Sequence, residues 1–160
     1  MSLPRELRIK GGKLIQTPVP AVEGLRGAEI APDGKLPEAC ELAIDVPEGD
    51  FALSLFTKAD GTGGLTLKYD AKAGKCAVDK TGMERRFNEK VGESLEVPLE
   101  RLSSLRVFID RSSTEIFFND GEATFTCHTY PTERERGFTV SGGAVRLWPM
   151  NASVTDAFVV

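Results

Sequence analysis

Apolar and polar residues alternate in short runs along most of the chain. A period of two places successive side chains on opposite faces of a strand, and the runs end at residues that favour turns, chiefly glycine, proline and aspartate. About a dozen such runs predict an all-β fold, a two-sheet antiparallel β-sandwich of jelly-roll or lectin-like type. The predicted strands span residues 6–9, 13–17, 40–46, 51–57, 65–70, 75–79, 94–98, 105–110, 113–119, 122–129, 138–141, 144–148 and 154–160.

The register of residues 105–127 follows from two turn signals. A two-residue loop at Asp120-Gly121 pairs Asn119 with Glu122, and a second at Arg111-Ser112 joins the preceding strand. Apolar residues of the three strands then share one face: Leu105, Val107, Ile109, Ile116, Phe118, Ala123, Phe125 and Cys127. A slip of one residue would turn this set away from the core, so register and burial agree. The opposite face mixes aromatic and polar residues, which indicates that part of it is covered: Arg106, Phe108, Glu115, Phe117, Thr124 and Thr126.

Two stretches depart from the strand pattern. Residues 18–27 form a connector in which residues 19–23 predict a single helical turn. Met83, Phe87 and Val91 recur four residues apart, as on a helix face. Glycines bracket this second stretch, so strand and loop is the preferred interpretation and a short helix the alternative.

Length and charge limit the classes of function that the chain can have. The 160 residues suffice for one domain. The 24 acidic residues outnumber the 20 basic ones, which argues against a nucleic-acid-binding protein because such proteins usually carry a basic face. No apolar run approaches the length of a membrane span, so no membrane partner is expected. A neutral ligand such as a sugar fits this charge balance.

The cysteines Cys40, Cys76 and Cys127 stand far apart in the sequence. An odd, scattered set predicts free thiols without a disulfide, in a reducing compartment. A zinc site is disfavoured because the chain has one histidine and no closely spaced cysteines. The first residues contain no apolar signal core, so the expected location is the cytoplasm.

Four segments carry a family pattern. They are Pro4–Leu7 with Leu14–Val19, Tyr69-Asp70 with Asp79–Gly82, the run Leu105-Arg-Val-Phe-Ile-Asp-Arg-Ser-Ser-Thr-Glu-Ile-Phe-Phe-Asn-Asp-Gly-Glu122, and Val145–Pro149. Taken in order, they resemble the C-terminal domain of glycoside hydrolase family 32, and most closely its bacterial sucrose-6-phosphate hydrolase, invertase and β-fructofuranosidase branch. The pattern departs from the family at Lys80, where arginine is usual.

The resemblance implies a five-bladed catalytic propeller followed by this sandwich. The family's nucleophile, transition-state stabiliser and general acid lie in Asn-Asp-Pro, Arg-Asp-Pro and Glu-Cys motifs. None matches here, because Asn119-Asp120 continues as Gly121, no arginine precedes an aspartate and no cysteine follows a glutamate. No catalytic residue, metal or organic cofactor is therefore expected in the chain. Residues 1–26 correspond to a linking hairpin and residues 27–160 to the sandwich.

The expected function is mechanical. The sandwich would pack on the propeller in cis and stabilise it, and the sequence also permits a homo-oligomer. A carbohydrate-binding module is the alternative, and it would need an exposed aromatic patch. A small stand-alone glycosidase would need two convergent carboxylates. The sequence assigns no residue to substrate binding, since the resemblance places the sugar pocket in the propeller.

The longest family segment contains a structural signature: Asp110, Arg111, Ser112, Ser113, Glu115 and Phe117. Asp110 and Glu115 are the only candidates in it for a glycosidase carboxylate pair, but the register favours structural roles. Glu115 lies opposite Phe108 and diagonal to Arg106, which predicts an ion pair with Arg106. Asp110 borders a turn, where aspartate commonly bonds backbone amides.

An aromatic surface is the candidate interdomain face. Trp148 alternates with Val145 and Leu147, so it points away from the core. Phe108 and Phe117 share the mixed face. We expect these three aromatic side chains to be clustered, unusually exposed and used in association.

Four other features receive structural interpretations. His128 lies opposite the core set, as a surface or interface residue. Tyr69 shares the parity of the apolar residues in its strand and is expected in the core. Residues 132–136 form a solvated charged loop, and Gly142-Gly143 forms a hairpin turn.

Overall fold

A computed structural model describes residues 3–86 and 94–152. These residues form twelve strands and two short 3-10 helices. The strands are β1 (Arg5–Lys10), β2 (Lys13–Pro18), β3 (Ala39–Asp45), β4 (Phe51–Thr57), β5 (Gly64–Asp70), β6 (Lys75–Gly82), β7 (Ser94–Pro98), β8 (Ser104–Asp110), β9 (Ser113–Phe118), β10 (Ala123–His128), β11 (Gly137–Val140) and β12 (Ala144–Pro149). The helices are η1 (Pro20–Leu25) and η2 (Asn119–Gly121).

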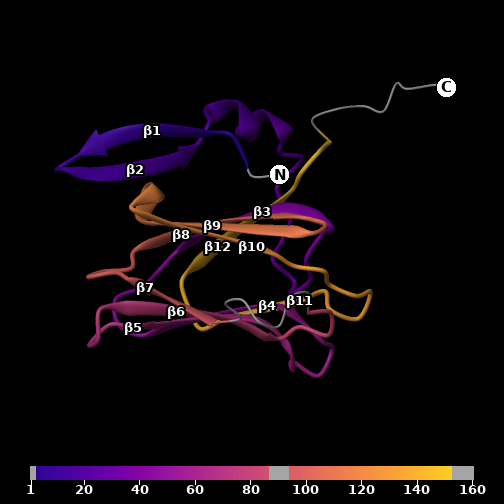
Figure 1. Ribbon diagram of the computed structural model, residues 1–160. Coiled ribbons are helices and arrows are strands. Elements are labelled where there is room, and N and C mark those ends of the chain that lie inside the picture. The colour runs from indigo at the N-terminus through magenta and orange to yellow at the C-terminus, as the bar shows by residue number, and fades with distance from the viewer. Residues whose placement is uncertain (1–2, 87–93, 153–160) are drawn as a thin grey trace.

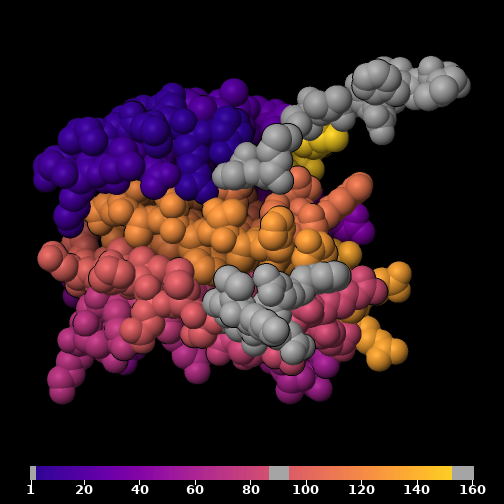
Figure 2. All heavy atoms as spheres, viewed as in Figure 1, coloured from indigo at the N-terminus to yellow at the C-terminus, as the bar shows by residue number. Residues whose placement is uncertain are grey.

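Two five-stranded antiparallel sheets face each other, as predicted. The first sheet has the order β10-β9-β8-β3-β12 and the second the order β11-β4-β5-β6-β7. The hairpin β1–β2 and helix η1 form a third layer on the side of the first sheet turned away from the second (Figure 1). We call that side the outer face of the first sheet. Figure 2 shows the N-terminal atoms, in indigo, spread over it.

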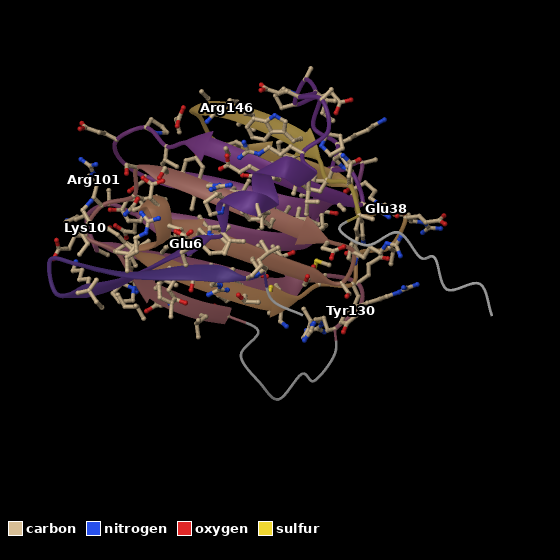
Figure 3. The ribbon with its side chains drawn as sticks, turned by 90° about the horizontal axis from the view of Figure 1, so that it is seen from above. Glu6, Lys10, Glu38, Arg101, Tyr130 and Arg146 are labelled. Atoms are coloured by element: carbon tan, nitrogen blue, oxygen red, sulfur yellow. The ribbon has the colours of Figure 1, made fainter. Side chains whose placement is uncertain are left out.

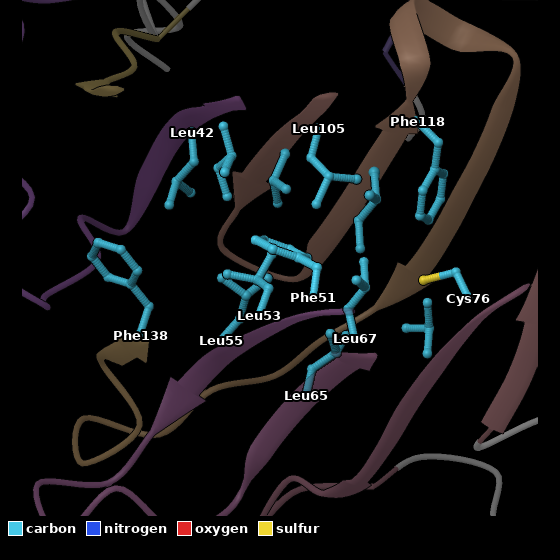
Figure 4. Close-up of a cluster of buried hydrophobic side chains, with 14 of the residues drawn as sticks. Leu42, Phe51, Leu53, Leu55, Leu65, Leu67, Cys76, Leu105, Phe118 and Phe138 are labelled. Carbon is cyan, nitrogen blue, oxygen red and sulfur yellow. The ribbon is translucent and has the colours of Figure 1, made fainter. Parts of the chain in front are cut away.

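The core lies between the two five-stranded sheets and follows the predicted register. Ile116 pairs with Val107 on one side and with Phe125 on the other. Leu42 and Leu105 from the first sheet meet Leu53 and Leu67 from the second (Figure 4). Each of these four leucines is at most 1% exposed. Because side chains alternate across a strand, this single apolar layer fixes the register of both sheets.

The turn between β9 and β10 is longer than the predicted two residues. Asn119 and Asp120 adopt φ angles of 48° and 56° and form η2 with Gly121, so Asn119 does not pair with Glu122 in the ladder. The pairing of the strands themselves is as predicted, because the loop gains one residue on each side. The side-chain oxygen of Asn119 accepts a hydrogen bond from the Ser103 amide at 2.9 Å, which ties this turn to the start of β8.

The prediction of a hairpin turn at Gly142-Gly143 is wrong. The two strands that it joins lie in different sheets, because β11 pairs with β4 and β12 pairs with β3. Alternation alone cannot distinguish a hairpin from a crossing between sheets. Gly143 is needed at this crossing, since its φ is 93° and a Cβ there would lie 2.1 Å from the Asp45 carbonyl oxygen.

The other sequence predictions divide into three groups. The helical turn in the connector is confirmed as η1, and Tyr69 is buried as expected. The segment 132–136 is not wholly solvated, because Glu135 is fully buried and accepts hydrogen bonds from the amides of Glu84 and Thr132. Met83 packs in the core, whereas Phe87, Val91 and the predicted strand 154–160 lie outside the described residues.

All three cysteines are free, as predicted. Cys40 and Cys76 are buried in the core and Cys127 packs against it. Burial raises the pKa of the Cys40 and Cys76 thiols to about 12 and that of Cys127 to about 11. The thiols are thus neutral packing groups at ordinary pH. They are also unreactive there, because the thiolate is the reactive form.

We expect all three thiols to resist a thiol reagent in the folded protein at pH 8 and to react in denaturant. Their thiolate fractions at that pH are on the order of 0.1% or less from the raised pKa values. The free energy of unfolding should also fall as the pH rises above about 9, because unfolded thiols ionise there and folded ones do not. Native and denatured thiol titrations test this expectation, and a disulfide in a non-reducing peptide map would contradict it.

Candidate functional site

The outer face of the first sheet carries an unusual set of polar and aromatic groups, all of which are buried except the half-buried Arg106. We call it the covered face: Glu41, Arg106, Phe108, Glu115, Phe117 and Trp148. These residues alternate with core residues along β3, β8, β9 and β12, so the pleat turns them away from the second sheet. The N-terminal segment lies over them.

Glu115 fastens the start of the chain to the covered face. Its carboxylate accepts a hydrogen bond from Arg5 Nη2 at 2.6 Å and another from the Leu3 amide at 2.6 Å. Arg5 also donates to Thr124 Oγ1 at 3.1 Å. Glu115 lies opposite Phe108, as predicted, but the predicted partner Arg106 is wrong. The ion-pair partner of Glu115 is instead Arg5, more than a hundred positions earlier in the chain. Rules for cross-strand pairs within one hairpin do not consider such distant residues.

Glu41 is the second anchor and is fully buried. Arg26 binds it through two hydrogen bonds of 2.8 Å, from Nε and Nη2. Arg106 Nε donates a third, also at 2.8 Å. The hydrogen bond with Glu41 raises the pKa of Arg26 above its usual value. A bidentate guanidinium and a second arginine satisfy a carboxylate that burial would otherwise penalise.

The expectation that Phe108, Phe117 and Trp148 are exposed is wrong. They are 5%, 2% and 7% exposed, respectively. Phe108 and Phe117 meet edge to face at 5.8 Å and pack with Val22 of η1. The guanidinium of Arg26 lies 4.3 Å from the centroid of Trp148. The chain's own N-terminal segment thus occupies the surface where an association partner was expected.

This arrangement also removes the basis of a sugar-stacking platform. A carbohydrate-binding surface needs aromatic faces open to a sugar ring, whereas cations and η1 cover these rings. His128 is exposed and stacks on Tyr130, with ring centroids 6.1 Å apart. It is a surface residue, as predicted.

The signature residues at the β8–β9 turn hold backbone together. Arg111 has a φ of 44°, and its amide donates to the Glu38 carbonyl at 3.2 Å. The Ser112 carbonyl accepts from the Thr129 amide at 3.0 Å, and the Ser113 hydroxyl donates to the Asp110 carbonyl at 3.4 Å. Asp110 lies exposed at the end of β8, while the Glu115 carboxylate is buried in its ion pair with Arg5. The two carboxylates therefore do not form a convergent pair.

The described residues contain no group of three or more histidine, cysteine, aspartate or glutamate side chains suited to a metal ion. Nor do they include a helix long and apolar enough to cross a membrane. A cavity of about 690 Å³ lies at the hairpin tip. Three cations (Lys10, Lys13 and Arg101) and three carboxylates (Glu100, Asp120 and Glu122) line it, so its charges are balanced. In the view from above, Lys10 and Arg101 lie at one end of the molecule and Glu38 at the other (Figure 3).

The family becomes clear from comparison with known proteins. Residues 15–155 match the family described as the C-terminal region of the glycosyl hydrolases family 32. The chain belongs to this family. The matched region begins within β2, so it includes η1 and both five-stranded sheets.

Relatives of this family 32 domain are longer proteins. It is 30% identical over 148 residues to the sucrose-6-phosphate hydrolase of Streptococcus mutans, and 31% identical over 148 residues to the raffinose invertase of Escherichia coli. The alignments cover 89% and 85% of the chain but 30% of each relative. The solved sucrose-6-phosphate hydrolase of Lactobacillus gasseri aligns with a TM-score of 0.82 at 25% identity, over 92% of this chain and 33% of that one.

Of the two anchors of the family 32 domain's covered face, sequence reasoning missed Glu41 entirely and gave Glu115 the wrong arginine as its partner. Glu41 alternates with core residues along its strand and so resembles an ordinary solvent-facing position. Arg5 and Arg26 lie in stretches interpreted as linker and connector. The one available signal was the mixed face itself, whose aromatic residues predicted a cover without indicating which segment supplies it.

Proposed function

We propose that this chain is the non-catalytic C-terminal sandwich of a β-fructofuranosidase that packs on and stabilises the five-bladed catalytic propeller preceding it in the same protein. In this proposal residues 1–26 link the two domains and residues 27–160 form the sandwich. The observation that carries the proposal is that Glu41 and Glu115, the buried carboxylates of the covered face, are bound to arginines of the same chain. Both have structural partners, so the proposal places the chemistry in the propeller.

The proposed substrate class of the whole enzyme is a terminal β-fructofuranoside, sucrose 6-phosphate or sucrose. The names of the relatives with 30% and 31% identity support this class. The proposed reaction retains the anomeric configuration through two carboxylates of the propeller and a covalent fructosyl intermediate. The free cysteines support a reducing location, which we propose to be the cytoplasm.

We expect the isolated chain to release no glucose or glucose 6-phosphate from sucrose or sucrose 6-phosphate. The reason is that its buried carboxylates already hold arginines, and Glu23, a further carboxylate beside Glu41, is bound to the same two arginines. A contaminant-free preparation assayed for both products tests this expectation. Reproducible release that survives further purification would contradict it.

A chimera tests the stabilising role. The matched C-terminal region of the Streptococcus mutans protein, 30% of its length, is replaced by this chain. We expect the chimera to hydrolyse sucrose 6-phosphate and to survive heating longer than the same relative without any C-terminal domain. A chimera that is inactive, or no more durable than the shortened relative, would contradict the proposed function.

A further inference from the structure

The hairpin β1–β2 carries an exposed apolar patch. Ile9 pairs with Leu14 and Leu7 pairs with Gln16, so these side chains share one face of the two-stranded sheet. Leu7, Ile9 and Leu14 are 64%, 74% and 47% exposed. They make up three of the five large apolar side chains that are exposed among the described residues. We call them the hairpin patch.

The end of the hairpin that contains Arg5 and Pro18 is anchored to the sandwich, whereas the hairpin patch lies toward the opposite end, near the turn. Pro18 is buried, and Arg5 binds both Glu115 and Gln16. A two-stranded sheet is marginal in water unless one face is packed. Here the packed part ends near Gln16 while the apolar residues continue beyond it.

We infer that the hairpin patch is the contact surface for the catalytic domain, an inference that rests on the proposed function. The chain matches a C-terminal family and covers 30% of its relatives, so the remainder of each relative lies mainly on the N-terminal side. The hairpin is the first element of this chain, and it projects from the layer farthest from the second sheet (Figure 1). It is therefore the element nearest in sequence to a domain that precedes the sandwich.

The charged residues of the hairpin lie apart from the patch. Lys10 and Lys13 pair directly at the hairpin tip and, because side chains alternate along a strand, they lie on the face opposite to the patch. Glu100, Asp120 and Glu122 line the same cavity as these lysines, so carboxylates of the chain itself accompany them. The patch itself is apolar, and the catalytic domain is thus inferred to present an apolar surface to it.

The test compares one triple variant with one single variant, each made in the isolated chain and in the chimera. The hairpin variant is Leu7→Ser with Ile9→Ser and Leu14→Ser, and the control is Leu95→Ser, which alters a leucine that is 50% exposed on β7 of the second sheet. In the isolated chain we expect both variants to melt within about 2 °C of the parent, because exposed side chains contribute little to folding. This measurement shows that the hairpin variant folds.

In the chimera the two variants should differ. We expect the hairpin variant to inactivate at least about tenfold faster on heating than the parent chimera, because burying three large aliphatic side chains is worth several powers of ten in a docking equilibrium. The Leu95→Ser chimera should inactivate at the parent rate. Equal durability of all three chimeras would overturn the inference while leaving the proposed function standing. An inactive parent chimera would instead refute the proposed function and the inference with it.

Sedimentation of the isolated chain tests whether a second copy of the chain, rather than the catalytic domain, binds to the hairpin patch. We expect a monomer for the parent and for the hairpin variant. A parent dimer that the hairpin variant abolishes would assign the patch to a second copy and overturn the inference.

Discussion

Replacing Glu41 by glutamine should lower the free energy of unfolding by about 3 kcal/mol, the low end of the range for breaking a buried ion pair. Glutamine keeps the size of the side chain but loses the charge that holds Arg26 and Arg106 together. Two guanidinium groups, each 23% exposed, would then share only the half-exposed carboxylate of Glu23, which lies 3.7 Å from Arg26 and 3.3 Å from Arg106. Urea denaturation of the isolated chain measures the loss.

A matched control separates burial from charge. Glu96 is 60% exposed and forms a surface ion pair with Lys75 at 2.6 Å. Water and salt screen surface ion pairs, so Glu96→Gln should change the unfolding midpoint little. Equal losses for the two variants would mean that the covered face is open to water. A crystal structure of the Glu41→Gln variant should also show Arg26 displaced from Trp148.

Replacing Ile116 by alanine should cost about 2–5 kcal/mol, because a fully buried branched side chain leaves a cavity that the core fills only in part. Ile116 lies in β9, the strand between β8 and β10, and points into the space between the two sheets. The midpoint of denaturant unfolding, with the slope checked for two-state behaviour, measures the effect.

Thr124→Ala is the control on the neighbouring strand. Thr124 faces the outer side, and its hydroxyl accepts one hydrogen bond from Arg5, so the expected cost is about 1 kcal/mol. A loss as large as that of Ile116→Ala would mean that the two faces of the sheet are equally buried, contrary to the register.

Local patterns predicted the strands well because strand pairing inside a meander depends on neighbours in sequence. The β8–β9–β10 register needed only alternation and two turns, and it was correct. The crossing at Gly143 and the ion pair of Arg5 with Glu115 depend on which distant segments meet. Alternation says that a residue points outward, but it does not say whether water or another part of the chain lies there. Trp148 points outward as predicted and is still buried.

The order of strands in the first sheet has a consequence for how the protein is made. The strand β3 lies between β8 and β12, both of which follow it by a long stretch of chain. During synthesis, at about 5–20 residues per second, β3 has no partner in its sheet until residues 104–110 have emerged. The second sheet can pair β4 with β5 and β5 with β6 in the meantime, since these are successive hairpins. The nascent chain therefore exposes the unpaired apolar strand β3 while the second sheet is already able to form. Non-local pairing of this kind slows folding, and chaperones can bind the exposed strand during that interval.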